Sequence, residues 1–135
     1  MIAALELEPH PEGGWYRQTW AAASGGTRPA GTAIYYLLAA SEVSHWHRID
    51  SAEVWHFYAG AALELSIAPT DDASAVPHIL GPDVGAGARP QIVVPPHHWQ
   101  SARTTGAWSL VGCTVSPGFQ FDQFELAASG WSPGA

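Results

Sequence analysis

The stretch VSHWHRIDSAEVWHFYAG, residues 43–60, consists of two strand-like runs joined by a tight turn. Both Val43–Ile49 and Ala52–Gly60 are rich in β-branched and aromatic residues, which favour strands. Only Asp50 and Ser51 separate the two runs, so the chain has room for little more than a hairpin turn. The stretch therefore predicts two neighbouring antiparallel strands.

Strand parity groups the polar side chains of this stretch. Side chains two residues apart on a strand point to the same face, so His45 and His47 are expected to present two imidazoles side by side. Glu53, Trp55 and Phe57 occupy alternate positions of the next strand, so their side chains are expected to point to the same face. Glu53 is expected to face the histidines from there. Imidazole nitrogens with a carboxylate oxygen suit Fe(II), Mn, Ni or Zn.

Further strand-like runs extend in both directions from this pair, separated by turns. Glycine and proline together supply 14 + 11 = 25 residues, which is typical of many short strands rather than long helices. No βαβ alternation occurs, so we expect one domain over residues 1–135 that is all-β, an antiparallel sandwich or barrel. Residues 1–7 are compatible with a short helix, and residues 128–135 are expected to form a frayed tail. The other expected strands are Gly14–Ala21, Thr32–Ala39, Ala62–Ile67, Gln91–His98 (ending in a proline turn), Trp108–Phe119 and Phe121–Leu126, with a loop over 78–90.

The charge composition excludes several functions. The formal net charge is −7, and all five basic residues are arginines. Without lysine the chain can form neither a Schiff base nor a phosphate-binding loop of the P-loop type. It also lacks the basic footprint of a nucleic-acid-binding protein.

Cysteine content and hydropathy bear on location. Cys113 is the sole cysteine, so no disulfide can form within the chain, as suits a reducing compartment. The first ten residues lack the basic and apolar regions of a signal peptide, and the longest apolar run, Ala33–Ala40, is too short to span a membrane. We therefore expect a soluble, cytoplasmic protein with no membrane partner.

The spacing from Glu53 to Gly60 resembles the first motif of the cupin superfamily of small jelly-roll barrels, in which a Glu is followed by six residues and a Gly. In that motif two histidines precede the Glu. The second cupin motif, Pro-x-Gly-x-x-His, is matched loosely by the run Pro95–Gln100.

Most of the chain is also similar to cupin family 5. The resemblance implies one jelly-roll domain, a homodimer, and an architecture related to the dTDP-sugar epimerases, without implying a particular reaction. Five ordered runs carry it: HPEGGWYRQTW (His10–Trp20), TAIYYLL (Thr32–Leu38), HRIDSAEVWHFYAG (His47–Gly60), QIVVPPHHWQ (Gln91–Gln100) and SLVGCTVSPGFQFDQFEL (Ser109–Leu126).

The chain departs from the cupin motifs at the metal ligands. If Glu53 is the motif glutamate, His47 takes the first histidine position and Ile49 the second. The rival register uses His45 and His47 and lengthens the turn before Glu53. In the second motif Gln100 stands at the histidine position. A divalent metal (Fe, Mn, Ni or Zn) would thus be held by His47, Glu53 and Gln100, although glutamine is a weak ligand for these metals.

A metal-free pocket is the other interpretation of the same residues. Burial among aromatic rings raises the pKa of a carboxyl group, so Glu53 would work as an acid or base near neutrality with His47 as its complement. A structural pairing of Glu53 that braces the barrel remains an alternative. The expected ligand-binding residues around them are His45, Trp55, Phe57, Tyr36, Gln100 and Trp99.

The run His10–Gly14, HPEGG, allows two interpretations. Proline and paired glycines are typical of a tight turn, which gives the run a conformational role. Alternatively Glu12 and Arg17 close the mouth of a pocket, in this chain or in a partner.

Two functions follow. The first is an enzyme that isomerises, epimerises or cleaves a small polar, sugar-like metabolite, with Glu53 and His47 as catalytic groups. The second is a binding module with the same pocket and no chemistry. Seven tryptophans in so short a chain also favour a homodimer, because large aromatic residues are enriched at interfaces.

Overall fold

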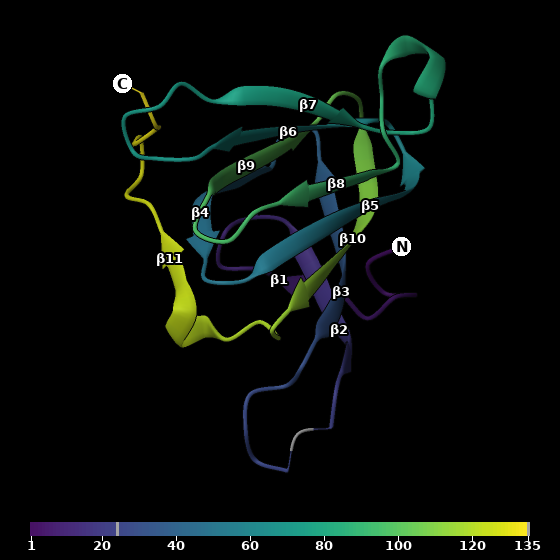
Figure 1. Ribbon diagram of the computed structural model, residues 1–135. Coiled ribbons are helices and arrows are strands. Elements are labelled where there is room, and N and C mark those ends of the chain that lie inside the picture. Colours follow the sequence, from purple (N-terminus) through teal and green to yellow (C-terminus); the bar gives the residue numbers. More distant parts are fainter. Residues whose placement is uncertain (24, 135) are drawn as a thin grey trace.

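Two antiparallel β-sheets make up the molecule in the computed structural model, which describes residues 1–23 and 25–134 (Figure 1). One sheet has the strand order β1-β2-β3-β10-β5-β8 and the other β11-β4-β9-β6-β7. The strands are β1 (Glu8–Pro9), β2 (Trp15–Ala21), β3 (Thr32–Ala39), β4 (Val43–Ile49), β5 (Ala52–Gly60), β6 (Leu63–Ala68), β7 (Val76–Leu80), β8 (Gln91–Val94), β9 (Trp99–Thr104), β10 (Trp108–Ser116) and β11 (Phe124–Leu126). Two 3₁₀ turns, Val84–Ala86 and Phe121–Gln123, complete the regular structure of the described residues.

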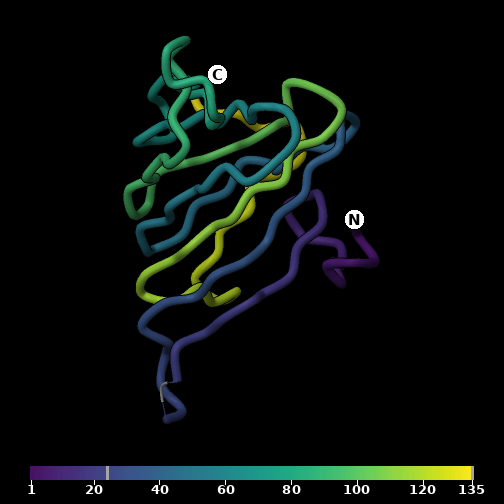
Figure 2. Tube along the Cα trace, turned by 90° about the vertical axis from the view of Figure 1, so that its right-hand side faces the viewer, coloured from purple at the N-terminus to yellow at the C-terminus, as the bar shows by residue number. Residues whose placement is uncertain are grey.

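The path of the chain is that of a jelly roll. From β3 to β11 it changes sheet at every connection except the hairpin of β6 and β7. Every strand pair within either sheet is antiparallel. The second view shows the long β2–β3 hairpin extending below the two layers (Figure 2). The expected all-β, antiparallel jelly roll is confirmed; the two sheets face each other as a sandwich.

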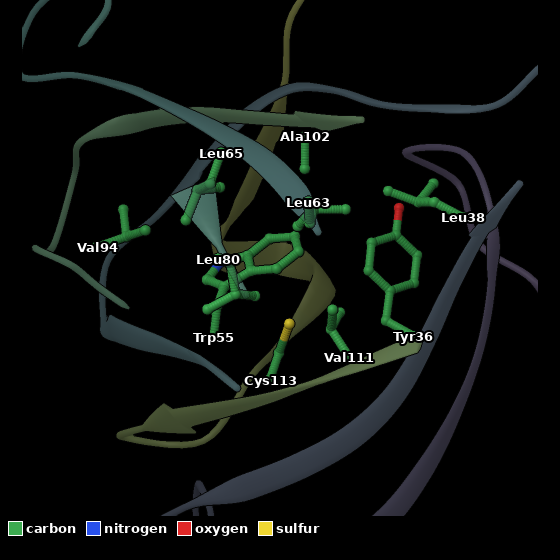
Figure 3. Close-up of a cluster of buried hydrophobic side chains, with 10 residues drawn as sticks. All are labelled: Tyr36, Leu38, Trp55, Leu63, Leu65, Leu80, Val94, Ala102, Val111 and Cys113. Atoms are coloured by element: carbon green, nitrogen blue, oxygen red, sulfur yellow. The ribbon is translucent and has the colours of Figure 1, made fainter. Parts of the chain in front are cut away.

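The core lies between the sheets, where alternate side chains of each strand point inward. Figure 3 shows the indole of Trp55 in the middle of a cluster that receives Tyr36, Val111 and Cys113 from the first sheet and leucines from the second. The Trp55 indole nitrogen donates a hydrogen bond to Gln100 Oε1 at 2.7 Å. The buried indole therefore has a polar partner, as a buried tryptophan requires.

A β-bulge in β4 separates the two histidines that were expected to face the same way. Ser44 and His47 pair with β9, and the register shifts between them. His47 is buried, whereas His45 Nε2 lies 3.0 Å from the carbonyl oxygen of Ala128 in the C-terminal segment. The expectation of two adjacent imidazoles is therefore wrong, because the extra residue of a bulge breaks strict alternation.

Both chain ends differ from expectation. Residues 1–7 form hydrogen-bonded turns instead of a short helix, and Glu6 has a positive φ of 56° that ends the turn. Residues 128–134 pack instead of fraying: the Trp131 ring contacts the Trp99 ring at a tilt of 47° with centroids 4.5 Å apart, and Gly134 N donates to Asp71 O. Residue 135 lies outside the described residues.

Besides the two-residue β1, the strands β7 and β9 were not expected. The first begins at Val76 beside a proline, and the second, WQSART, is largely polar. Neither run shows the apolar alternation from which a strand is predicted. Among the described residues no helix is long and apolar enough to cross a membrane.

Gly13 forms the turn that carries Glu12 beneath β4. Its φ is +111°, and a Cβ atom there would lie 2.0 Å from the carbonyl oxygen of Val43. Its own carbonyl oxygen accepts a hydrogen bond from the Tyr36 hydroxyl. The conformational role of the HPEGG run thus depends on a backbone contact that admits only glycine.

We predict that Gly13→Ala lowers the free energy of unfolding by about 3 kcal/mol or more, because it adds a backbone clash to the strain of a positive φ. Gly26→Ala is the matched control, since Gly26 has a φ of +95° but open space around its Cβ position. Urea denaturation of both variants measures the difference. Equal losses in the two variants would contradict the role of the Val43 contact.

Candidate functional site

A hydrogen-bonded chain across the two sheets fixes the Glu53 carboxyl group. Glu53 lies on β5 in the first sheet, and Gln100 on β9 in the second donates from Nε2 to Glu53 Oε1 at 2.9 Å. Gln100 in turn accepts from the Trp55 indole. All three residues are buried. The amide is thus held with its donor toward Glu53, which orients the carboxyl group within the sandwich.

His47 on β4 is held by a second carboxylate, Glu12. Its Nδ1 donates to the backbone oxygen of His45 at 2.8 Å, and Glu12 Oε2 lies 2.7 Å from the same nitrogen. His45 N donates to the backbone oxygen of Glu12 at 2.8 Å, tying the turn before β2 to β4. His47 Nε2 makes no hydrogen bond within the described part of the chain, so it is available to a molecule in the adjoining cavity.

His10 completes the buried polar cluster. Its Nδ1 accepts a hydrogen bond from the backbone N–H of Glu12 at 3.1 Å, so a neutral ring carries its proton on Nε2. The ring contacts Tyr16 edge to face, with centroids 4.5 Å apart. Burial is the main cause that lowers the pKa of His10, more than Glu12 raises it. His10 is therefore the neutral member of the cluster near pH 7.

A cavity of about 100 Å³ joins these groups. Its apolar wall comes partly from the segment after β10, where Phe119, Phe121 and Phe124 pack together with centroids 4.8–6.1 Å apart. Its polar side holds two carboxyl groups and two imidazoles. The lining residues are His10, Glu12, Tyr16, Gln18, Thr32, Ile34, His47, Glu53, Cys113, Val115, Phe119, Phe121 and Phe124.

The two carboxyl groups of the cavity ionise at very different pH. Burial raises the pKa of Glu53 to about 7; the His47 charge opposes this shift, and the Glu12 charge adds to it. Burial also acts to raise the pKa of Glu12, but the charge and close contact of His47, with smaller contributions from His10 and Ser44, outweigh it and the pKa is lowered. Near neutrality Glu12 is therefore ionised, while Glu53 exchanges its proton readily.

His47 is the cationic member of the cluster. Burial acts to lower its pKa, but the charge of Glu12, its contact with Nδ1 and the charge of Glu53 together raise the pKa to about 9. At neutral pH His47 is thus an imidazolium whose Nε2–H is unused by the protein. The site thus combines a proton donor, His47, with the carboxyl group of Glu53, which is about half ionised near pH 7. Glu12 is the fixed counter-ion of His47.

Of the predicted site residues, Glu53 and His47 line this cavity together. The residues predicted to bind ligand do not line it. Tyr36 and Trp55 belong to the apolar core, and Phe57 packs against that core. Gln100 lies behind Glu53, where it orients the carboxyl group.

The other two predicted ligand-binding residues lie near the C-terminal segment. His45 contacts Ala128, and Trp99 donates from its indole nitrogen to Asp71 Oδ1 at 2.7 Å. The guanidinium of Arg48 stacks over the Trp99 ring, 4.4 Å from its centroid. This aromatic side chain anchors the C-terminal segment and does not face the cavity.

Glu12 and His10 are the site residues that sequence reasoning undervalued. Both belong to the HPEGG run, whose glycines favoured a purely conformational interpretation. The alternative, that Glu12 closes a pocket, is closer to the structure, but Arg17 does not take part and pairs with Glu6 at 3.4 Å. The signal available in the sequence was a glutamate beside a histidine in a turn-forming run.

The residues do not fit a resident divalent metal held by His47, Glu53 and Gln100. The one metal-binding atom of Gln100, Oε1, is taken up by the Trp55 indole. Only His47 Nε2 and one oxygen of Glu53 remain, fewer than the three or four protein ligands of a zinc-type site. Among the described residues no group of three or more His, Cys, Asp or Glu is placed to hold a metal ion. The fixed orientation of the amide thus leaves this set of three residues unsuited to hold the metal.

Comparison with family models matches residues 1–127 to the family described as Cupin superfamily (DUF985), also termed Cupin_5. The match spans nearly the whole chain, so the protein belongs to this cupin family. The resemblance seen in the sequence is confirmed, and the fold is that of small-molecule-binding cupins. No curated protein matches the chain.

Solved structures agree with this assignment. A protein from Shewanella oneidensis is 42% identical, with a TM-score of 0.88, over 94% of this chain and 82% of that chain. A hypothetical protein from Leishmania major is 32% identical, with a TM-score of 0.87, over 94% and 85% of the two chains. Oxalate decarboxylase from Bacillus subtilis is 11% identical with a TM-score of 0.67 over 87% of this chain and 29% of that chain, so it shares the fold alone.

We predict that Glu12→Gln lowers the pKa of His47 well below its value of about 9, because burial then acts without the main counter-charge. A raised histidine pKa stabilises the fold below pH 6.5, and this contribution is lost as the pH rises through about 9. The variant is therefore expected to lose about 3 kcal/mol near the acid end of this window and progressively less toward its alkaline end.

Ring-carbon NMR of histidine-labelled protein measures the His47 titration, and urea denaturation across the same window measures stability. Glu64→Gln is the matched control, because this surface carboxylate on β6 pairs with Arg103 outside the cavity. An unchanged His47 titration in Glu12→Gln would contradict the ion pair.

Proposed function

We propose that this cupin is a small acid–base enzyme that isomerises, epimerises or cleaves a small polar, sugar-like metabolite, with Glu53 and His47 as its proton-transfer groups. One observation carries the proposal: the two side chains line one cavity, where His47 has a pKa of about 9 and Glu53 a pKa of about 7. A carboxyl group with a pKa near 7 takes and returns protons at neutral pH, which is the condition for efficient general acid–base catalysis.

The chemistry that suits this pair is proton transfer next to a carbonyl group. Glu53, as the carboxylate, removes a proton from the carbon beside the carbonyl. The electron pair of that C–H bond becomes the C=C bond of an enol, whose oxygen receives the proton of His47 Nε2. In a hydroxy-carbonyl compound this enol is an enediol: Glu53 delivers its proton to the former carbonyl carbon, and the hydroxyl on the neighbouring carbon gives its proton to His47 and becomes the new carbonyl group. This completes an isomerisation, and no external oxidant or reductant is needed.

Glu12 and Gln100 act through the two reacting groups. Glu12 keeps His47 protonated and fixes its ring through Nδ1, so the proton available for transfer is the one on Nε2. Gln100 holds one oxygen of Glu53, and the Cys113 thiol is a second hydrogen-bond partner of the same carboxyl group. Phe119, Phe121 and Phe124 give the cavity an apolar wall beside these groups.

A non-catalytic metabolite-binding cupin is the second candidate. The observation that favours it is the apolar wall formed by Phe119, Phe121 and Phe124, because pockets with aromatic walls and few polar groups are typical of binding sites. In that case Glu53 would orient the ligand by accepting a hydrogen bond.

We predict that Glu53→Gln lowers turnover by about 10²–10⁴-fold while ligand affinity and fold remain close to those of the wild type, because a positioned proton-transfer group contributes that factor. Melting curves, a binding isotherm and, with the substrate in hand, a rate for this variant test it, with Glu64→Gln as the control of equal charge change. A change in affinity alone would favour the binding module. A loss of about 1–3 kcal/mol in stability without either effect would make Glu53 structural.

A homodimer through the outer face of the six-stranded sheet is also part of this proposal. That face carries a groove lined by Trp20, Val54 and Thr114, with a volume of about 390 Å³. Trp20, Tyr58 and Val93 are 56%, 51% and 57% exposed, which is high for large apolar side chains. A second copy of the chain would cover them. A cytoplasmic location fits a chain whose one cysteine is buried and unpaired.

We predict that light scattering gives twice the chain mass of 14.3 kDa at micromolar concentration, and that Val93→Glu returns the chain mass because it places a charge in the buried interface. Val84→Glu is the control, since Val84 is 53% exposed in a 3₁₀ turn outside this sheet. A wild-type protein with the mass of one chain would contradict the homodimer.

A further inference from the structure

The cavity around Glu53 contains no arginine, and this bears on what it can bind. Each of the five arginines is engaged elsewhere. Arg28 makes a bidentate pair with Asp50 at 2.7 and 2.8 Å, and Arg48 contacts Glu125 at 3.0 Å and Asp71 at 3.4 Å. Arg17 and Arg103 pair with Glu6 and Glu64, and Arg89 donates to backbone oxygens.

Among the described residues that line the cavity, His47 is the only cation, and its charge is already balanced. Glu12 Oε2 lies 2.7 Å from His47 Nδ1, so the pair is neutral as a unit. Glu53 then adds a negative charge whenever it is ionised. A ligand carboxylate or phosphate would have to enter beside one or two buried carboxylates, without a cation of its own to meet.

The remaining polar groups offer hydrogen bonds without charge. Thr32, Gln18 and Tyr16 line the cavity, as does the neutral ring of His10. The opposite wall is aromatic and aliphatic. Such a site satisfies the hydroxyl and carbonyl groups of an uncharged molecule while its carbon skeleton lies against the phenylalanines.

We infer that the cavity selects uncharged hydroxy-carbonyl compounds and excludes carboxylates and phosphate esters, because Glu53 and the Glu12–His47 pair leave no cation free. This inference rests on the proposed function, since it names the substrate class of the same site. It goes beyond the family resemblance, because the nucleotide-linked sugars of the related epimerase architecture are anions.

The exclusion depends on the charge of Glu53. The groups that face this carboxyl from the surrounding elements are His47 on β4, Glu12 in the turn before β2, Gln100 on β9 and Cys113 on β10. Cys113 stays a neutral thiol, because burial raises its pKa well above the ordinary range. Protonation of Glu53 below about pH 7 therefore removes the net negative charge of the cavity, since the other four groups keep their charge or remain neutral.

Matched pairs of neutral and anionic probes test this: lactamide with lactate, and glycolamide with glycolate. Binding is followed by saturation-transfer NMR of the probe and by the shift of the His47 ring-carbon signal. At about pH 8 we expect the amides to bind the wild type at least about tenfold more tightly than the acids. In Glu53→Gln the acids are expected to bind within about threefold of the amides, as they should in the wild type at about pH 6.

Glu64→Gln is the control, because it removes the same charge outside the cavity and is expected to leave the preference unchanged. Equal binding of lactate and lactamide by the wild type at the alkaline pH, or the same relief in Glu64→Gln, would overturn the inference and leave the acid–base proposal intact. Binding of neither member of either pair would overturn both the ligand class and the proposed site. Amide preference combined with a normal rate in Glu53→Gln would support the ligand class and overturn the acid–base chemistry.

Discussion

The buried contact between Glu12 and His47 is the interaction on which the rest of the site depends. A carboxylate and an imidazole without partners would be costly to bury, but at 2.7 Å each stabilises the charge of the other. The pair also has an architectural effect, because it joins the turn before β2 to β4 in the opposite sheet. The two sheets pack around this pair and leave a cavity in which Glu12 and His47 are already charged and held by their partners.

Glu12 and Glu53 show how the same type of side chain acquires two different pKa values in one cavity. Both are buried, so desolvation acts to raise the pKa of each. Glu12 contacts the imidazolium directly and stays ionised, whereas the direct partner of Glu53 is the neutral Gln100 amide. The glutamine stands where the cupin motif has a histidine. The residues that would otherwise ligate a metal therefore form an arrangement suited to moving protons.

The fold was predictable from sequence to a large extent, because inward and outward side chains alternate along most strands. The runs Thr32–Ala39, Val43–Ile49 and Ala52–Gly60 coincide with β3, β4 and β5. β9 escaped prediction because its buried positions include Gln100, whose partners come from the other sheet. The C-terminal segment was expected to fray because nothing local holds it; Trp131 is held by Trp99, which is distant in sequence.

The sequence by itself determined the antiparallel jelly roll, the cupin family and the placement of Glu53 among aromatic rings, because alternation and motif spacing are local properties of the chain. Only the tertiary structure decided which groups meet Glu53 and His47. The bulge in β4 turned His45 away, and the Gly13 turn delivered Glu12 instead. Proton affinities in a buried cluster follow from distances between side chains of different elements, and local spacing does not encode those distances.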